Sequence, residues 1–224
     1  MNARWHLSHP MPKRATTKAR IAWHQGHAKH CGCRPIPPKL QALMLREHLV
    51  GGDRRSVAGS KRALSMIEAE PALVKELARL ANDPDALVSM RALDLLEKLA
   101  HSDPDWVQPH KRLFIGPLAD SEAWEIHLQI VRALPLLRWT AREKKRVIEI
   151  LERDLGHRQK FVRAWALDSL ATFAADQPAL LPAVVVNLTR FDNSGSKALA
   201  TRARHIRERL DLVPKKRRPS ARKP

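Results

Sequence analysis

The chain has 224 residues and a formal charge of +18, from 41 Lys and Arg against 23 Asp and Glu. Aromatic residues are few, with six Trp, four Phe and no Tyr, and this composition favours helices over a sheet-rich fold. The longest apolar stretch, residues 179–188, has about half the length that a membrane-spanning helix needs, so we expect no membrane partner.

The positive charge is concentrated in the two ends. Residues 1–46 hold nine Lys or Arg and no acid, and residues 214–224 hold six and no acid. The intervening residues 47–213 carry 26 basic and 23 acidic residues, so the body of the chain is nearly neutral.

Residues 1–38 are predicted to be a disordered basic extension, because no helical periodicity precedes Leu40. The segment lacks the continuous apolar region of a secretory signal, and its Pro and His residues interrupt the amphipathic helix of a transit peptide. Met44 stands just before the patterned region, so an alternative is that translation starts there and residues 1–43 lie upstream of the native protein.

The stretch WHQGHAKHCGC, residues 23–33, contains three His and both Cys of the chain. Zinc accepts such donors, but structural zinc sites normally join two ligand pairs separated by a loop, and here all donors fall within ten residues. We therefore predict no specific metal site and no cofactor, only adventitious binding by composition. The weak candidates for metal ligands are His24, His27, His30, Cys31 and Cys33.

Two cysteines separated by one residue cannot staple a fold of this size. This cysteine usage favours a reducing compartment, and we expect a cytoplasmic protein.

From Leu40 onward, apolar residues recur at spacings of three and four, and turn residues interrupt them at regular intervals. The pattern predicts about five helix pairs: 38–49 with 53–69, 72–81 with 86–100, 105–118 with 122–138, 141–154 with 160–175, and 179–190 with 197–210. Pro135 falls inside one predicted helix and should kink it, because proline lacks an amide donor.

The second helices of these pairs repeat. Val88, Ile126, Val162 and Leu199 each follow a polar turn, and they lie 38, 36 and 37 residues apart. A period near 37 that contains two helices is typical of an α-solenoid.

The turns NDPDALV, LADSEAWEI and LGHRQKFV, each followed by a small or apolar residue at four and a Leu at eight, resemble those of HEAT repeats. The segment from about residue 40 to 212 is similar to small bacterial HEAT-repeat proteins of unassigned function. The resemblance implies an all-α, right-handed α-α superhelix of the HEAT/ARM type as one domain over residues 39–212. HEAT repeats usually carry Arg directly after the first apolar residue of this helix; Arg163 follows that pattern, whereas Ser89, His127 and Ala200 depart from it.

In such a solenoid the second helix of each pair lines the concave side. The resemblance therefore implies that Asp94, Arg132, Asp168 and His205 form one row there, and that Arg91, Gln129, Trp165 and Arg202 form its edge. Alternating charge suits a protein partner better than a phosphate backbone, but it also suits ion pairing between neighbouring repeats. Trp165 is either a binding anchor or a filler between helices. The candidates for partner binding are Arg91, Arg132, Trp165, Asp168 and Arg202.

Enzymatic readings find little support in the sequence. HEAT-like DNA glycosylases of alkylation repair use concave-face Trp and Asp residues, and by this resemblance Trp165 and Asp168 would hold damaged DNA, with Arg132 and Arg163 on phosphates. The chain has no nucleophile with a neighbouring base at a recognisable spacing and no Gly-rich phosphate loop. We therefore predict no catalytic residues and no small-molecule substrate.

Residues 213–224 are predicted to be a disordered basic tail. Its candidates for nucleic-acid binding are Lys215, Lys216, Arg217 and Arg218. The sequence thus predicts a non-enzymatic interaction scaffold that binds a protein partner through its concave face. The alternative is a nucleic-acid-binding module that uses its basic tails.

Overall fold

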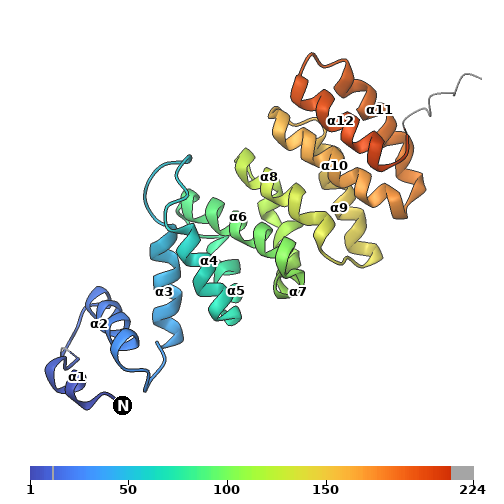
Figure 1. Cartoon of the computed structure of the whole chain (residues 1–224). Coiled ribbons are helices and arrows are strands. Elements are labelled where there is room, and N and C mark those ends of the chain that lie inside the picture. Colours follow the sequence, from blue (N-terminus) through green and yellow to red (C-terminus); the bar gives the residue numbers. More distant parts are fainter. Residues whose placement is uncertain (12, 213–224) are drawn as a thin grey trace, which may run out of the picture. The chain divides into compact units, whose positions relative to one another are not determined.

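The computed structural model describes residues 1–11 and 13–212 (Figure 1). All secondary structure in these ranges is helical, without a strand, which confirms the predicted all-α class. None of the helices in these ranges is both long enough and apolar enough to cross a membrane. The nucleic-acid candidates Lys215, Lys216, Arg217 and Arg218 lie outside the described residues.

The chain divides into two compact units, residues 1–110 and residues 111–224, which are described separately. The helices of the first unit are α1 (Ala3–Ser8), α2 (Thr17–His30), α3 (Pro38–Leu49), α4 (Ser60–Ala69), α5 (Val74–Leu80), α6 (Ala86–Ser102) and α7 (Pro104–Val107). Its core consists of fully buried aliphatic side chains from α3 to α6, among them Leu45, Leu49, Ile67, Leu77, Leu93 and Leu96. Burying each such side chain contributes about 1.5–3 kcal/mol.

The first 38 residues differ from the predicted disordered extension, because they contain α1 and α2. The Thr16 side chain caps α2 by accepting a hydrogen bond from the Ala19 amide. Ile21 of α2 packs in one cluster with Leu40 and Met44 of α3. A search for apolar periodicity overlooks α2, because two of its three buried residues are histidines.

The predicted helix 53–69 begins only at Ser60. Gly51 and Gly52 both have positive φ angles, 85° and 71°, which end the helical path after α3. The Asp53 side chain then accepts hydrogen bonds from the amides of Arg55 and Ser56 and fixes a turn in place of a helix.

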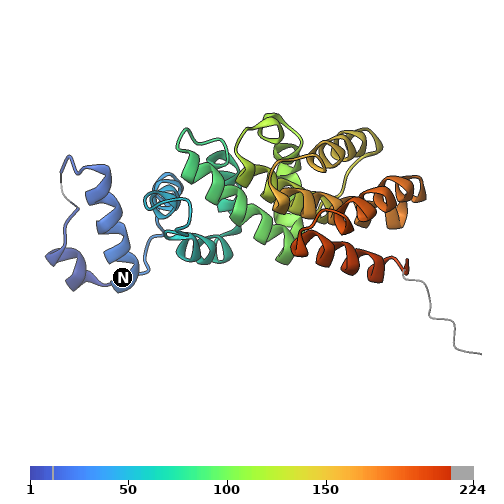
Figure 2. The same ribbon diagram turned by 90° about the horizontal axis from the view of Figure 1, so that it is seen from above.

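In the second unit the helices are α8 (Trp124–Ala133), α9 (Ala141–Asp154), α10 (Lys160–Asp176), α11 (Leu181–Asp192) and α12 (Lys197–Arg209). The central helix is α10, which packs against each of the other four (Figures 1 and 2). The repeat residues Val162 and Leu199 are fully buried, as are Ile130, Ala166 and Ala203, four residues after the start of each repeat. The repeated apolar positions in the sequence therefore correspond to the buried face of the second helix of each pair.

Two predicted helices are interrupted where proline removes an amide donor. In place of one helix over 105–118, α7 is followed by the 3-10 segments η2 (Gln108–Phe114) and η3 (Pro117–Asp120). The sequence predicts a helix that continues to residue 138 with a kink at Pro135. Instead, α8 ends at Ala133 and a 3-10 turn, η4 (Leu134–Leu136), follows it.

Shorter 3-10 turns precede two more helices of the solenoid. These turns are η1 (Pro71–Leu73) before α5 and η5 (Pro178–Leu180) before α11. Each begins with proline, whose fixed φ suits the first position of a helical turn.

Candidate partner-binding site

Four of the five predicted partner-binding residues lie together in the second unit. Arg132 of α8, Trp165 and Asp168 of α10, and Arg202 of α12 form one group, which also includes Arg209 of α12. We call these five residues the Trp165 cluster. Trp165 and Asp168 are three residues apart on α10, so they share one face of this helix, and α8 and α12 both pack against α10.

Two guanidinium groups lie over the half-buried indole of Trp165. The Cζ atom of Arg202 is 4.0 Å from the ring centroid, and the Cζ atom of Arg132 is 5.1 Å from it. Guanidinium groups at such distances are attracted by the negative face of the ring. Trp165 of α10 therefore contacts one positive charge from α8 and one from α12.

The carboxylate of Asp168 bonds to both arginines of α12. One carboxylate oxygen accepts from Nη1 of Arg202 at 3.3 Å, and the other accepts from Nη1 of Arg209 at 3.3 Å. Arg209 also donates to the backbone carbonyl of Asp168 at 2.9 Å. The two arginines of α12 thus share one carboxylate, and these three side chains alone carry a net positive charge.

The fifth predicted residue, Arg91, is not at the surface, which corrects the sequence prediction. Its side chain is 98% buried in the first unit, and its guanidinium donates to the backbone carbonyls of Leu49, Asp53 and Ser56 at 2.5–3.1 Å. Those three carbonyls lie at the end of α3 and in the loop that follows it. Arg91 therefore fixes this loop and cannot contact a partner.

Two of the three residues that stand in place of the usual HEAT arginine, Ser89 and His127, make structural links. The Ser89 hydroxyl donates to the carbonyl of Ala81 at 2.6 Å. His127 of α8 joins α9 through a 2.9 Å contact between Nδ1 and a carboxylate oxygen of Asp154, and its Nε2 donates to the Ser121 carbonyl at 2.5 Å. Ser89 and His127 therefore each form a polar link to a neighbouring segment.

The His127–Asp154 pair resembles a catalytic dyad but is already engaged at both ring nitrogens. The hydrogen bond to Asp154 raises the pKa of His127, and the bond to the Ser121 carbonyl acts in the same direction against the cost of burial. An imidazole that bonds on both sides has no free nitrogen to accept a substrate proton. We assign the pair a structural role.

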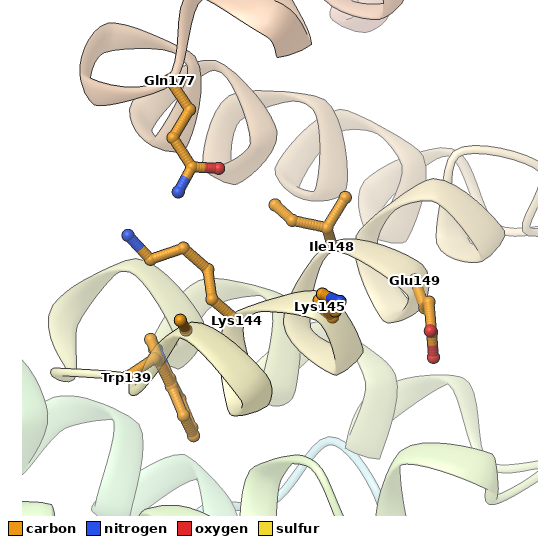
Figure 3. Close-up of a pocket in the computed structure, with 7 residues that line it drawn as sticks. Trp139, Lys144, Lys145, Ile148, Glu149 and Gln177 are labelled. Atoms are coloured by element: carbon orange, nitrogen blue, oxygen red, sulfur yellow. The ribbon is translucent and has the colours of Figure 1, made fainter.

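A pocket of about 520 Å³ lies beside α9 in the second unit (Figure 3). The side chains of Lys144 and Gln177 extend toward each other across it, whereas the indole of Trp139 points away. That indole instead donates to the Leu134 carbonyl at 2.7 Å and lies 5.4 Å from Nζ of Lys111. None of the lining residues is fully buried, so the pocket lacks the desolvated polar groups of a specific small-molecule site.

Three of the five weak metal candidates lie together. His27, Cys31 and Cys33 meet at the end of α2, and they are joined there by His6 of α1. Neither His24 nor His30 belongs to this group: His24 is buried nearby, and the exposed ring of His30 stacks on Trp5. A hydrogen bond from the Asn2 amide lowers the pKa of the Cys31 thiol to about 6.

Sequence reasoning missed two residues of these groups, His6 and Arg209. His6 lies 21 positions before His27, in a helix of six residues that is too short to show periodicity. Arg209 did have a signal, because it is seven residues after Arg202 and hence on the same face of the last helix.

No family model matches the chain, and no curated protein is detectably similar to it in sequence. Its structure is similar to a crystal structure of an engineered protein, with a TM-score of 0.55 and 15% identity over 95% of this chain and 98% of that chain. It is also similar to a designed armadillo repeat protein in complex with the peptide (KR)4, with a TM-score of 0.53 and 14% identity over 84% of this chain and 85% of that chain. Another designed armadillo repeat protein matches with a TM-score of 0.51 and 14% identity, over 89% of this chain and 94% of that chain. At these identities the likeness concerns the fold, and it confirms the predicted armadillo-like α-solenoid.

Proposed function

We propose that the protein is a non-enzymatic, cytoplasmic interaction scaffold that binds an acidic peptide segment of a protein partner at the Trp165 cluster. The observation that carries this proposal is that the guanidinium groups of Arg132 and Arg202 both lie over the ring of Trp165, with Arg202 and Arg209 bonded to the carboxylate of Asp168. Guanidinium groups recognise carboxylates by paired hydrogen bonds, and Trp and Arg are frequent anchors at interfaces.

The fold supports a peptide as the binding partner. One solved structure of similar fold is a designed armadillo repeat protein with the bound peptide (KR)4. In the Trp165 cluster the excess charge is positive, so the complementary peptide is acidic. Equivalent helices in a solenoid present their side chains at a regular spacing, which suits an extended segment.

The ion pairs of Asp168 bear on the glycosylase alternative. A carboxylate that stabilises a cationic sugar must face it directly, whereas both oxygens of Asp168 already accept hydrogen bonds from arginines. This arrangement favours binding through the arginines over catalysis through Asp168.

Binding of labelled peptides under low salt tests the proposal. The probes are an acidic octapeptide of alternating Glu and Asp, the (KR)4 peptide, and a single-stranded DNA of matched charge. We expect the acidic peptide to bind and (KR)4 not to bind. Replacing Arg202→Ala should weaken peptide binding about tenfold, because it removes a charged hydrogen-bond donor worth about 1.5 kcal/mol.

The matched control is Arg204→Ala, an exposed residue two positions away on the same helix α12. It changes the net charge equally, so it should alter the affinity by less than about twofold if the cluster is the site. Equal losses in both variants would show attraction by net charge alone and contradict the proposal. If Arg202→Ala weakens DNA binding and the acidic peptide does not bind, the nucleic-acid alternative replaces it.

A further inference from the structure

Four side chains that can ligate a metal meet where α1 lies against the end of α2. They are His6 on α1, His27 in the last turn of α2, and Cys31 and Cys33 directly after that helix. Their ligand atoms all lie within 4.8 Å of one another. The Cys33 sulfur is 3.3 Å from Nε2 of His27 and 3.5 Å from Nε2 of His6.

We propose that His6, His27, Cys31 and Cys33 form a structural zinc site. In a tetrahedral zinc site, bond lengths of about 2.0–2.1 Å to nitrogen and about 2.3 Å to sulfur place neighbouring ligand atoms roughly 3.3–3.8 Å apart. The distances from the Cys33 sulfur to His27 and to His6 both fall in this range. Two thiolates and two imidazoles form a donor set that favours zinc over magnesium or calcium.

The ligands come from two regions of sequence, as in structural zinc sites generally. His6 precedes His27 by 21 residues, so the metal would close a loop and join α1 to the end of α2. The two cysteines follow directly after the last turn of α2. At this end of the helix the Cys31 amide donates to the His27 carbonyl at 2.7 Å.

The surroundings suit bound thiolate and imidazole ligands. The Asn2 amide donates to the Cys31 sulfur at 3.1 Å, a contact that stabilises negative charge on this atom. The indole of Trp23 stacks on His27 at 5.1 Å between ring centroids, and Trp5 contacts the same ring at 5.5 Å. His27 is 99% buried, so its ring is held in place by packing.

The metal would compensate for a small apolar core. Within the described part of residues 1–33, the buried side chains are Trp5, Ile21, His24, His27 and Cys31, and two of these are proposed ligands. Segments of this size commonly need a metal or disulfides to fold. Zinc binding would displace the protons of both thiols, and each imidazole would ligate as the neutral ring.

Metal titration of the full chain without a histidine tag tests the site. We expect one zinc per chain by elemental analysis of the reduced protein. Cobalt(II) should bind with the intense visible absorption of tetrahedral coordination and the charge-transfer band of cobalt–thiolate bonds. Replacing His6→Gln should weaken cobalt binding by more than about tenfold, because removing a ligand costs at least as much as removing an outer-shell partner.

The matched control is His30→Gln, an exposed histidine three residues from His27 on the same helix. It should leave the cobalt affinity, the metal stoichiometry and the absorption spectrum unchanged.

Circular dichroism of each variant shows whether the helical body remains folded. Hydrogen exchange should show that a chelator increases amide exchange in residues 1–33. Equal losses in the His6 and His30 variants would indicate adventitious binding and overturn the proposal. So would the absence of stoichiometric metal, or loss of both thiol hydrogens to a Cys31–Cys33 disulfide.

Discussion

The guanidinium of Arg91 bonds to three backbone carbonyls, that of Leu49 at the end of α3 and those of Asp53 and Ser56 in the loop between α3 and α4. The loop contains two glycines with positive φ, and the buried Arg91 guanidinium supplies hydrogen-bond donors to its carbonyls. The same residue type at an equivalent face of α12, Arg202, instead lies on Trp165. Position within a repeat therefore does not decide whether an arginine bonds to buried backbone carbonyls or lies on an aromatic ring.

Replacing Arg91→Met should lower the free energy of unfolding by about 3 kcal/mol, because it leaves buried carbonyls without donors. Urea unfolding followed by circular dichroism measures this change. The control Arg62→Met removes an exposed arginine of α4 and should change the stability by less than about 0.5 kcal/mol. Equal effects of both replacements would refute the buried role of Arg91.

At the scale of elements, polar links join α8 to α9 and α3 to the turn after α5. His127 of α8 binds Asp154 at the end of α9, and Arg46 of α3 binds Asp83, just after α5, through two hydrogen bonds at 2.8 and 3.0 Å. The hydrogen bonds from Arg46 lower the pKa of Asp83. Each link is a charge-assisted hydrogen bond with a defined geometry. It therefore helps to fix the position of one helix against the next.

The His127–Asp154 link should make the stability of the second unit depend on pH. Because the folded-state pKa of His127 is raised above 6.5, its contribution is fully present below pH 6.5 and is lost as the pH rises through the folded pKa. Asp154 and Arg153 face the ring from α9, and His157 faces it from the following turn. Burial lowers the pKa of His157, so this residue acts in the opposite sense.

The test compares unfolding free energies of the wild type and His127→Gln between pH 5.5 and 9. We expect the difference to be largest at the acidic end and to shrink above pH 6.5. The exposed His205→Gln on α12 serves as the control and should give no such trend. A difference for His127→Gln that stays constant with pH would show that the ring is neutral in the folded protein.

At the scale of the whole molecule, charge and fold are separate properties. The armadillo-like solenoid comes from apolar periodicity, whereas most of the net charge of +18 comes from the two ends of the sequence. Such basic segments attract polyanions without sequence preference, and this attraction weakens with salt.

Deleting residues 214–224 should therefore reduce the salt dependence of single-stranded DNA binding while leaving acidic peptide binding at the Trp165 cluster in place. Six cations are lost, so the slope of log affinity against log salt should become shallower by up to about 4. Titrations at several salt concentrations give this slope. An unchanged DNA affinity at low salt would end the nucleic-acid role of the tail.

The sequence by itself determined the all-α solenoid, because buried apolar residues recur with the period of the repeat and local turns mark the helix ends. It also predicted most of the Trp165 cluster, since equivalent positions of successive helices must be neighbours. It could not show that Arg91 turns inward, because its carbonyl partners lie 35 to 42 residues away. Likewise, only the tertiary structure showed that His6 lies beside His27 and the two cysteines. Apolar periodicity indicates which face of a helix is buried, but it does not indicate which polar side chains meet across a loop.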